Sequence, residues 1–405
     1  MTVQPPPDSG RLVDRSASPA EFEREFGEPL GKVLDLGTWS SGSDLPALYE
    51  RLDAEITSAL TQENRVKQAL RAEVFPQIGN RARPGAPPLA GHHQLPLETV
   101  EKLHRTVLFA GDVEACDGTV LVHDAVALTV IQLGICLISY NGDEGTWSHR
   151  LFRRDLRAVP DSPIEEALQL LDLRDRRTAV GVDDPRDRLT ELGRRGIMTY
   201  AERAVLAGMA GAPWRLGHGT PAPFELLTGA GSLDLVERAL DVLTKLLLEH
   251  RRFAFVPSAP RLRALLTIGS ALRPLEFAVV HTLRSYIEDI VERGHLRDRR
   301  LQRAREFVAE AGEQVVVGVY RVSRHAPPYV FYAPAEPELC AQAAAIVMAD
   351  AALQEHRGFP LLLDMADQLC RANFGREEFL GTVGAAYAAQ DRALSQLAER
   401  ETRPD

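Results

Sequence analysis

The spacing of hydrophobic and polar positions separates an N-terminal helical part of the chain from a mixed remainder. Between Leu45 and Val74, apolar residues recur every three or four positions, which predicts one long amphipathic helix. Its stripe is either a seam for self-association or a face buried in the helix's own domain, and burial is the simpler interpretation. Further upstream, Ser18 followed by Pro19 predicts the N-cap and first turn of a shorter helix. The stripe of the long helix consists of Leu45, Leu48, Leu52, Ile56, Leu60, Val66 and Leu70.

Segment 76–97 is rich in proline and glycine and predicts an irregular loop or linker. After a short helix over 97–108, three β-rich runs predict a meander of strands at Val113–His123, Val126–Tyr140 and Trp147–Phe152. The remainder alternates helices with short strands, which predicts an α/β fold, a mixed sheet flanked by helices. Its strands are expected at 214–216, 253–256, 314–322 and 329–332, and its helices at 163–174, 184–210, 232–250, 261–269, 275–293, 297–311, 337–354, 360–373 and 376–399.

Composition narrows the class of protein. The chain has 405 residues, 45% of them hydrophobic and 26% charged, which is typical of a soluble globular protein. Its four cysteines are widely spaced, which excludes a zinc ribbon or a disulfide scaffold and fits a reducing compartment. The most apolar stretch, 125–139, is too short to cross a bilayer, and the N-terminus does not resemble a signal peptide. We therefore expect a cytoplasmic protein without membrane association.

The formal net charge of −10 argues against a protein that binds duplex DNA without a partner, because basic side chains make the contacts to DNA phosphates. Several enzyme signatures are absent from the sequence: GxxxxGK[ST], GxGxxG after a strand, HExxH and GxSxG. P-loop ATPases, Rossmann dehydrogenases, zincins and α/β-hydrolases are therefore disfavoured.

Four polar residues are candidates for a site. Asp117, in the segment Cys116–Thr119, is either a carboxylate presented to a metal from a strand or part of an Asp-Gly turn. Glu202 lies on an otherwise apolar helix face, where a carboxylate requires a cation or an arginine partner. His218 follows a short strand and is either a ligand or an ordinary loop residue. Asp367 lies in the helix after Pro360 and is either a ligand or the i,i+4 partner of Arg371.

The order of these segments resembles the NurA nuclease family. The matching segments are CDGT at 116–119 with the apolar strand after it, TYAERAVLAGM at 199–209, WRLGHGT at 214–220, VGVYRVS at 317–323 and GFPLLLDMADQL at 358–369. The resemblance implies an RNase H-like mixed sheet flanked by helices, here with an N-terminal helical extension. It also implies DNA cleavage with manganese (magnesium is the alternative), a homodimer, and docking on a HerA-type hexameric ATPase during the processing of DNA ends.

By this resemblance, Asp117 and Glu202 match metal-binding carboxylates of the family. His218 stands where the family has an aspartate, and Asp367 stands where it often has a histidine. A lysine expected before Pro257 is missing from FAFVPSAP. Two hypotheses follow: an active nuclease whose metal site is Asp117, Glu202, His218 and Asp367, or a NurA-like scaffold or regulator of the ATPase whose site has decayed. Along the chain we expect a disordered tail at 1–17, a helical segment at 18–75, the loop at 76–97, the nuclease domain at 98–399 and a tail at 400–405.

Overall fold

The computed structural model describes residues 18–39, 45–124, 129–142, 146–154, 185–229, 233–259 and 262–394. The expected tails at 1–17 and 400–405 and the expected helix at 163–174 lie outside these ranges. The chain divides into two compact units, Met1–Ala69 and Leu70–Asp405. The division falls inside the long helical run, between helix α3 (Leu45–Ala69) and the π-helical turn η3 (Leu70–Val74) that continues it.

The N-terminal unit consists of helices in its described part. Helix α1 (Pro19–Phe26) begins at Ser18, whose hydroxyl accepts a hydrogen bond from the Glu21 N–H while the Glu21 carboxylate accepts one from the Ser18 N–H. This capping box confirms the predicted helix start. Helix α2 (Leu30–Leu34) and the 3₁₀ turn η1 (Leu36–Thr38) follow. They do not bury the apolar stripe of α3, in which Leu52 and Ile56 are each 49% exposed. The prediction that this stripe is buried in the helix's own domain is therefore wrong within this unit.

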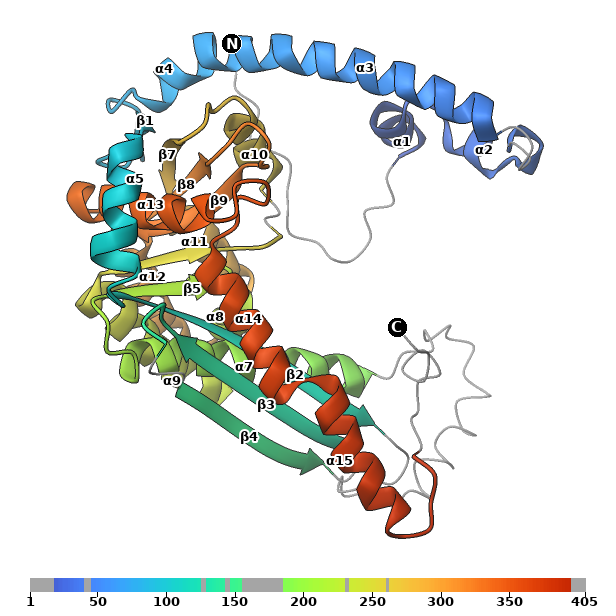
Figure 1. Cartoon of the computed structure of the whole chain (residues 1–405), viewed down its shortest axis with the longest axis vertical. Helices are drawn as coiled ribbons and strands as arrows, with labels where there is room; N and C mark the ends of the chain where they lie inside the picture. The colour runs from blue at the N-terminus through green and yellow to red at the C-terminus, as the bar shows by residue number, and fades with distance from the viewer. Residues whose placement is uncertain are drawn as a thin grey trace. The chain divides into compact units, whose positions relative to one another are not determined.

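The second unit is built on one mixed sheet, which confirms the predicted fold class (Figure 1). Its nine described strands have the order β1-β7-β8-β9-β6-β5-β2-β3-β4. Strand β5 pairs in parallel with β2 on one side and with β6 on the other, and the remaining pairings are antiparallel. The bounds are β1 Gly91–Gln94, β2 Val113–Asp124, β3 Thr129–Ile138, β4 Thr146–Arg154, β5 Trp214–His218, β6 Phe253–Val256, β7 Glu276–Thr282, β8 Val315–Arg321 and β9 Tyr329–Pro334.

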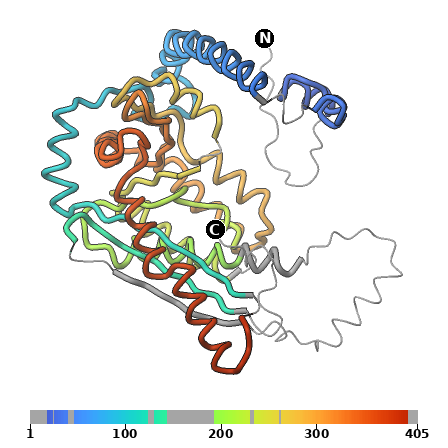
Figure 2. Tube along the Cα trace, turned by 45° about the vertical axis from the view of Figure 1, so that its right-hand side comes forward, coloured from blue at the N-terminus to red at the C-terminus, as the bar shows by residue number. Residues whose placement is uncertain are grey.

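Helices cover both faces of the sheet. One face packs against α5 (Leu97–Leu103), η4 (His104–Leu108), α13 (Pro337–Ala352) and α14 (Leu361–Phe374). The other packs against α7 (Pro185–Gly208), α8 (Phe224–Thr228), α9 (Leu233–Thr244), η6 (Lys245–His250), α11 (Arg284–Arg293) and α12 (Asp298–Gln314). Because side chains alternate along a strand, Ala115 of β2 belongs to the first core and Cys116 to the second. Figure 2 shows α14 and α15 (Arg376–Ala388) running across the long strands of the meander.

Three sequence-based assignments need correction. Segment 76–97 is not wholly irregular, since it contains the end of helix α4 (Phe75–Ile78) and the edge strand β1. The helix expected at 275–293 is strand β7 followed by α11, because a strand buried on both faces has the same unbroken apolar run as a buried helix. The last described helix, α15, ends at Ala388 rather than 399. Helix α10 (Arg263–Ser270), the β8–β9 hairpin and the three-strand meander are confirmed.

No helix in the described part of the chain is both long and apolar enough to cross a membrane.

Candidate functional site

The candidate site lies where strand β5 ends beside the longer strand β2. The parallel pairing of the two strands runs from Val113–Trp214 to Cys116–Gly217. The next residue on each strand is Asp117 and His218, respectively, so the two side chains emerge next to each other. Carboxyl ends of parallel strands are where ligands of α/β proteins commonly bind. The sheet topology thus unites two candidates that are 101 positions apart in the sequence (218 − 117).

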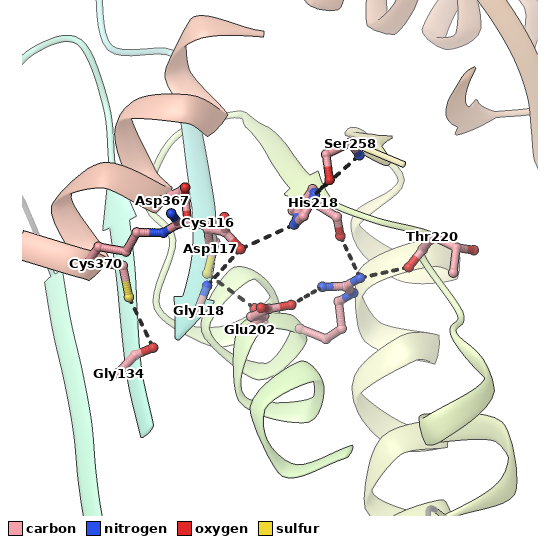
Figure 3. A network of polar contacts seen from close by, with 12 residues as sticks. Cys116, Asp117, Gly118, Gly134, Glu202, His218, Thr220, Ser258, Asp367 and Cys370 are labelled. Carbon is pink, nitrogen blue, oxygen red and sulfur yellow. Dashed lines mark hydrogen bonds and ion pairs between the residues drawn. The ribbon is translucent and has the colours of Figure 1, made fainter. Parts of the chain in front are cut away.

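Asp117 lies within β2, so its Asp-Gly pair is not a turn. The carboxylate is buried, and its Oδ1 accepts a hydrogen bond of 2.9 Å from the Gly118 N–H. The same oxygen lies 3.4 Å from Nδ1 of His218 (Figure 3).

Glu202 reaches the site from α7, on the other face of β2. Its helix approaches closely because residue 118 is glycine: a Cβ there would stand 2.8 Å from Oε1 of Glu202 and 3.1 Å from Cγ of Met198. The Glu202 carboxylate is 5% exposed, and burial, opposed by the positive charge of Arg203, raises its pKa to about 7. A carboxyl group with this pKa can hold or release a proton near neutral pH.

Arg203 fixes the surroundings of Glu202. Its guanidinium is 2% exposed, donates a hydrogen bond of 2.7 Å to Oε2 of Glu202, and donates to the carbonyl oxygens of His218 and Thr220 at 2.8 and 2.7 Å. It also lies 4.8 Å from the centre of the Phe255 ring, a cation–π contact. The arginine partner that the sequence allowed for Glu202 is therefore present, and it ties α7 to the turn after β5.

His218 is held between two partners (Figure 3). Its Nε2 lies 2.9 Å from Oγ of Ser258 and accepts a hydrogen bond of 3.3 Å from the Ser258 N–H. Because Nε2 accepts, the imidazole proton is on Nδ1 and faces Asp117. Burial disfavours the charged imidazolium, but the hydrogen bond to Asp117 and the negative charges of Asp117 and Glu202 outweigh it, so the pKa of His218 is raised.

Asp367 joins the cluster from α14. Burial and the negative charge of Asp117 raise its pKa, and His218 and Arg371 act in the opposite direction. Its Oδ1 accepts a hydrogen bond of 2.9 Å from Nε of Arg371, the i,i+4 pair that the sequence allowed. All four candidates therefore interact, although they come from β2, α7, β5 and α14.

The chemical types of these side chains fit manganese, which accepts both carboxylate oxygen and imidazole nitrogen. Their present arrangement does not: within the described ranges, no three carboxylate, imidazole or thiol side chains gather closely enough to hold an ion. Arg203 occupies one oxygen of Glu202, and Arg371 occupies one oxygen of Asp367. As the side chains stand, two of the three carboxylates are already neutralised by arginines.

Sequence reasoning missed Gly118, Arg203 and Ser258 as parts of this cluster. The sequence holds one usable signal, the arginine directly after Glu202 on a helix of apolar character. Ser258 is 40 positions from His218, and only the pairing of β5 with β6 brings the two together.

No protein-family model matches the chain, and no curated protein matches it in sequence. Among solved structures, it is similar to the NurA nuclease from Sulfolobus solfataricus, with 9% identity and a TM-score of 0.41 over 69% of this chain and 84% of that one. It is also similar to NurA bound to dAMP and manganese, with 8% identity and a TM-score of 0.42 over 79% of this chain and 93% of that one. The function proposed below rests on the chain's own residues.

Proposed function

We propose that this chain is a DNA nuclease and that Asp117, Glu202, His218 and Asp367 form its active site. The observation that carries the proposal is the convergence of four polar side chains from four elements, two of which, Asp117 and Glu202, are buried. Burying ionisable groups costs stability, so such a cluster is typical of a functional site rather than of a structural core.

The protonation behaviour of the cluster suits phosphodiester hydrolysis. That reaction requires a group that accepts a proton from water and a group that stabilises or protonates the leaving oxygen. With a pKa of about 7, Glu202 is able to accept a proton at neutral pH. His218 has a raised pKa and is oriented by Asp117 and Ser258, which suits it to donate one.

Manganese is the cofactor that we propose, with magnesium as the alternative. A divalent ion at this site would supply positive charge for water activation and for the leaving oxygen. Binding would require the Asp367 carboxylate to turn away from Arg371, which its position at the surface of α14 allows, since that side chain is 30% exposed.

The net charge of −10 suggests how DNA reaches the site. An acidic protein lacks the excess of basic side chains that binds DNA strongly, so a nuclease of this charge would depend on a partner that delivers DNA to it. We therefore propose a HerA-type hexameric ATPase as the partner, and resection or degradation of DNA ends, in double-strand-break repair or in defence against foreign DNA, as the task.

The test is cleavage of end-labelled duplex and single-stranded DNA with manganese, with magnesium and with a chelator, with and without the ATPase. We expect Asp117→Asn and Glu202→Gln each to lower cleavage by about 100-fold or more. Asp364→Asn is the matched control, because Asp364 lies on the same helix as Asp367 but pairs with Arg357. Unchanged cleavage in both site variants would refute the assignment.

A second candidate function is a scaffold or regulator of the ATPase without nuclease activity. The neutralisation of Glu202 by Arg203 and of Asp367 by Arg371 favours it specifically. Failure of the folded wild-type chain to cut DNA under every condition, together with retained binding to the ATPase, would establish the scaffold.

A further inference from the structure

Ser258, His218 and Asp117 form a continuous chain of polar contacts beside the ends of β5 and β6 (Figure 3). Oγ of Ser258 lies 2.9 Å from Nε2 of His218, and Nδ1 of the same imidazole lies 3.4 Å from Oδ1 of Asp117. A hydroxyl, an imidazole and a carboxylate in this order are the parts of a Ser-His-Asp triad. In such a triad the imidazole takes the hydroxyl proton and the carboxylate orients the imidazole. Ser258 has no role in the metal site described above.

The backbone of Ser258 fixes the direction of these hydrogen bonds. The Ser258 N–H donates to Nε2 of His218 at 3.3 Å, so Nε2 carries a lone pair and no proton. The imidazole proton is therefore on Nδ1, facing Asp117, and the Ser258 hydroxyl is the donor to Nε2. A general base requires this tautomer, because its free lone pair has to face the hydroxyl that it deprotonates.

The three side chains differ in exposure in the way that a nucleophilic site requires. Asp117 is 6% exposed, so water screens its charge only weakly. The His218 side chain is 34% exposed, and it packs edge-to-face on the ring of Phe359 with 6.2 Å between the ring centres. Ser258 is exposed, so a substrate can reach its hydroxyl.

The fold brings the three residues together without a sequence signature of hydrolases. Strands β5 and β6 pair in parallel as far as His218–Val256, and Ser258 follows two residues later. Ser-His-Asp triads recur on unrelated folds and in different chain orders, so they are recognised by geometry and roles. The absence of GxSxG therefore excludes one fold family but not a triad.

Charge around the triad indicates the class of substrate. Two of the three carboxylates in the cluster pair with arginines, and the third, Asp117, pairs with His218. When no metal ion is bound, a negative charge therefore remains close to Ser258. This charge repels an anionic phosphodiester, whereas a neutral carboxylic ester pays no such penalty.

We propose that Ser258 is the nucleophile of a metal-independent site that hydrolyses neutral carboxylic esters, with His218 as general base and Asp117 as the residue that positions His218. Oγ attacks the carbonyl carbon while its proton moves to Nε2, the bond to the leaving alkoxide breaks, and the alkoxide takes that proton. A water molecule then attacks the seryl ester and passes a proton through Nε2 to Oγ, which releases the acid and restores Ser258. Because no metal ion takes part, the proposal does not rest on the proposed nuclease function.

Covalent capture by a fluorophosphonate tests the nucleophile directly. An activated serine hydroxyl displaces fluoride from this probe and keeps a phosphonyl ester, which peptide mass spectrometry locates. In a chelating buffer, we expect the full-length wild type to be labelled at Ser258 and Ser258→Ala to lack this label. His218→Gln should slow the labelling by about 100-fold or more. Absence of the Ser258 adduct in the wild type, or labelling that His218→Gln leaves unchanged, would overturn the proposal.

Ser323→Ala is the matched control for the labelling. The Ser323 hydroxyl donates to the carbonyl oxygen of Glu355 at 2.6 Å, so no imidazole activates it. This substitution should leave the labelling of Ser258 unchanged. An adduct at Ser323 as abundant as that at Ser258 would show that the probe reports exposure rather than activation, and it would refute the triad.

Hydrolysis of p-nitrophenyl acetate in the same chelating buffer tests the class of substrate. We expect turnover by the wild type and its loss in Ser258→Ala. Asp117→Asn should lower kcat by roughly 100-fold with an unchanged KM, because an amide can donate to Nδ1 and thereby place the imidazole proton on Nε2. Cleavage of bis(p-nitrophenyl) phosphate in place of the acetate would overturn the assignment to neutral esters.

Manganese separates this proposal from the proposed nuclease function. An ion bound by Asp117 and His218 would withdraw both side chains from Ser258, so manganese should slow the labelling if these residues bind metal. Labelling that manganese leaves unchanged would count against the metal site and would support the triad. Absence of labelling in the chelating buffer would refute the triad and leave the metal site standing.

Discussion

At the scale of single residues, the distance between α7 and β2 depends on the absence of a side chain at residue 118. A Cβ at this position would stand 2.7 Å from Cδ1 of Ile135 as well as 2.8 Å from Glu202. Gly118→Ala therefore has to push α7 outward or turn the Glu202 carboxylate. We expect a loss of about 1–3 kcal/mol of unfolding free energy, as in other overpacked cores. Urea denaturation measures this loss, and DNA cleavage should fall with it.

Gly208→Ala is the control for that substitution. Gly208 is the last residue of α7, and a Cβ there would meet nothing within 4 Å. Since alanine has the higher helix propensity, this change should be neutral or slightly stabilising. Equal effects of the two substitutions would contradict the steric account of Gly118.

Residue types singled out four candidates, because carboxylates and a histidine within apolar segments are unusual, but only the resemblance of the sequence motifs to the NurA family joined them into one site. The roles of their neighbours could not be predicted in the same way. Arg203 is one of 43 arginines, and its burial follows from contacts with carbonyl oxygens that the fold brings near it. Ser258 contacts His218 only because β5 and β6 pair in parallel.

At the scale of elements, Asp350 joins three parts of the fold. This fully buried residue of α13 accepts hydrogen bonds from the Tyr140 hydroxyl, just after β3, and from the Leu362 N–H in the first turn of α14. Burial raises its pKa to about 6, and the two hydrogen bonds oppose the increase. Asp350 thus anchors the start of the helix that carries Asp367.

The raised pKa predicts how stability depends on pH. The folded chain holds the Asp350 proton more tightly than the unfolded chain, so its stabilising effect is complete below pH 3.8 and is lost as pH rises through about 6. We expect Asp350→Asn, which cannot ionise, to remove this dependence. The unfolding free energy of the variant minus that of the wild type should therefore increase by about 3 kcal/mol at most between pH 4 and pH 7.

Urea denaturation of both proteins across that pH range measures the difference. Tyr140→Phe is the companion variant: it removes a hydrogen bond that lowers the pKa of Asp350, so the loss of stability should extend to higher pH. Parallel stability curves for wild type and Asp350→Asn would contradict this account.

Predictability at this scale depended on the kind of strand. The meander and the β8–β9 hairpin have alternating or β-branched sequences between turn residues, so the sequence pattern was enough to predict these strands. Strand β1 contains Gly91, His92 and His93, and it exists because its backbone pairs with β7 at the edge of the sheet. Backbone pairing leaves no mark in the sequence pattern, which is why this strand was missed.

At the scale of the whole molecule, the sheet and the candidate site belong to the same one of the two units. All nine described strands and all four candidate site residues belong to the unit Leu70–Asp405. Arg71, just inside this unit, donates two hydrogen bonds, of 2.6 and 3.1 Å, to the Glu276 carboxylate of β7. Glu276 is 4% exposed, so this contact offsets the cost of a buried charge.

Two truncations are therefore expected to differ sharply in stability although they begin only five residues apart. We expect a chain of residues 70–405 to keep the unfolding free energy and the DNA cleavage of the full-length protein. A chain of residues 75–405 also lacks Arg71 and leaves the Glu276 carboxylate buried without its partner. It should lose about 3 kcal/mol of unfolding free energy. Glu276→Gln in the shorter chain should restore part of this loss, since a neutral amide costs less to bury. Urea denaturation measures both effects, and equal stability of the two truncations would show that the Arg71–Glu276 contact does not hold η3 to the sheet.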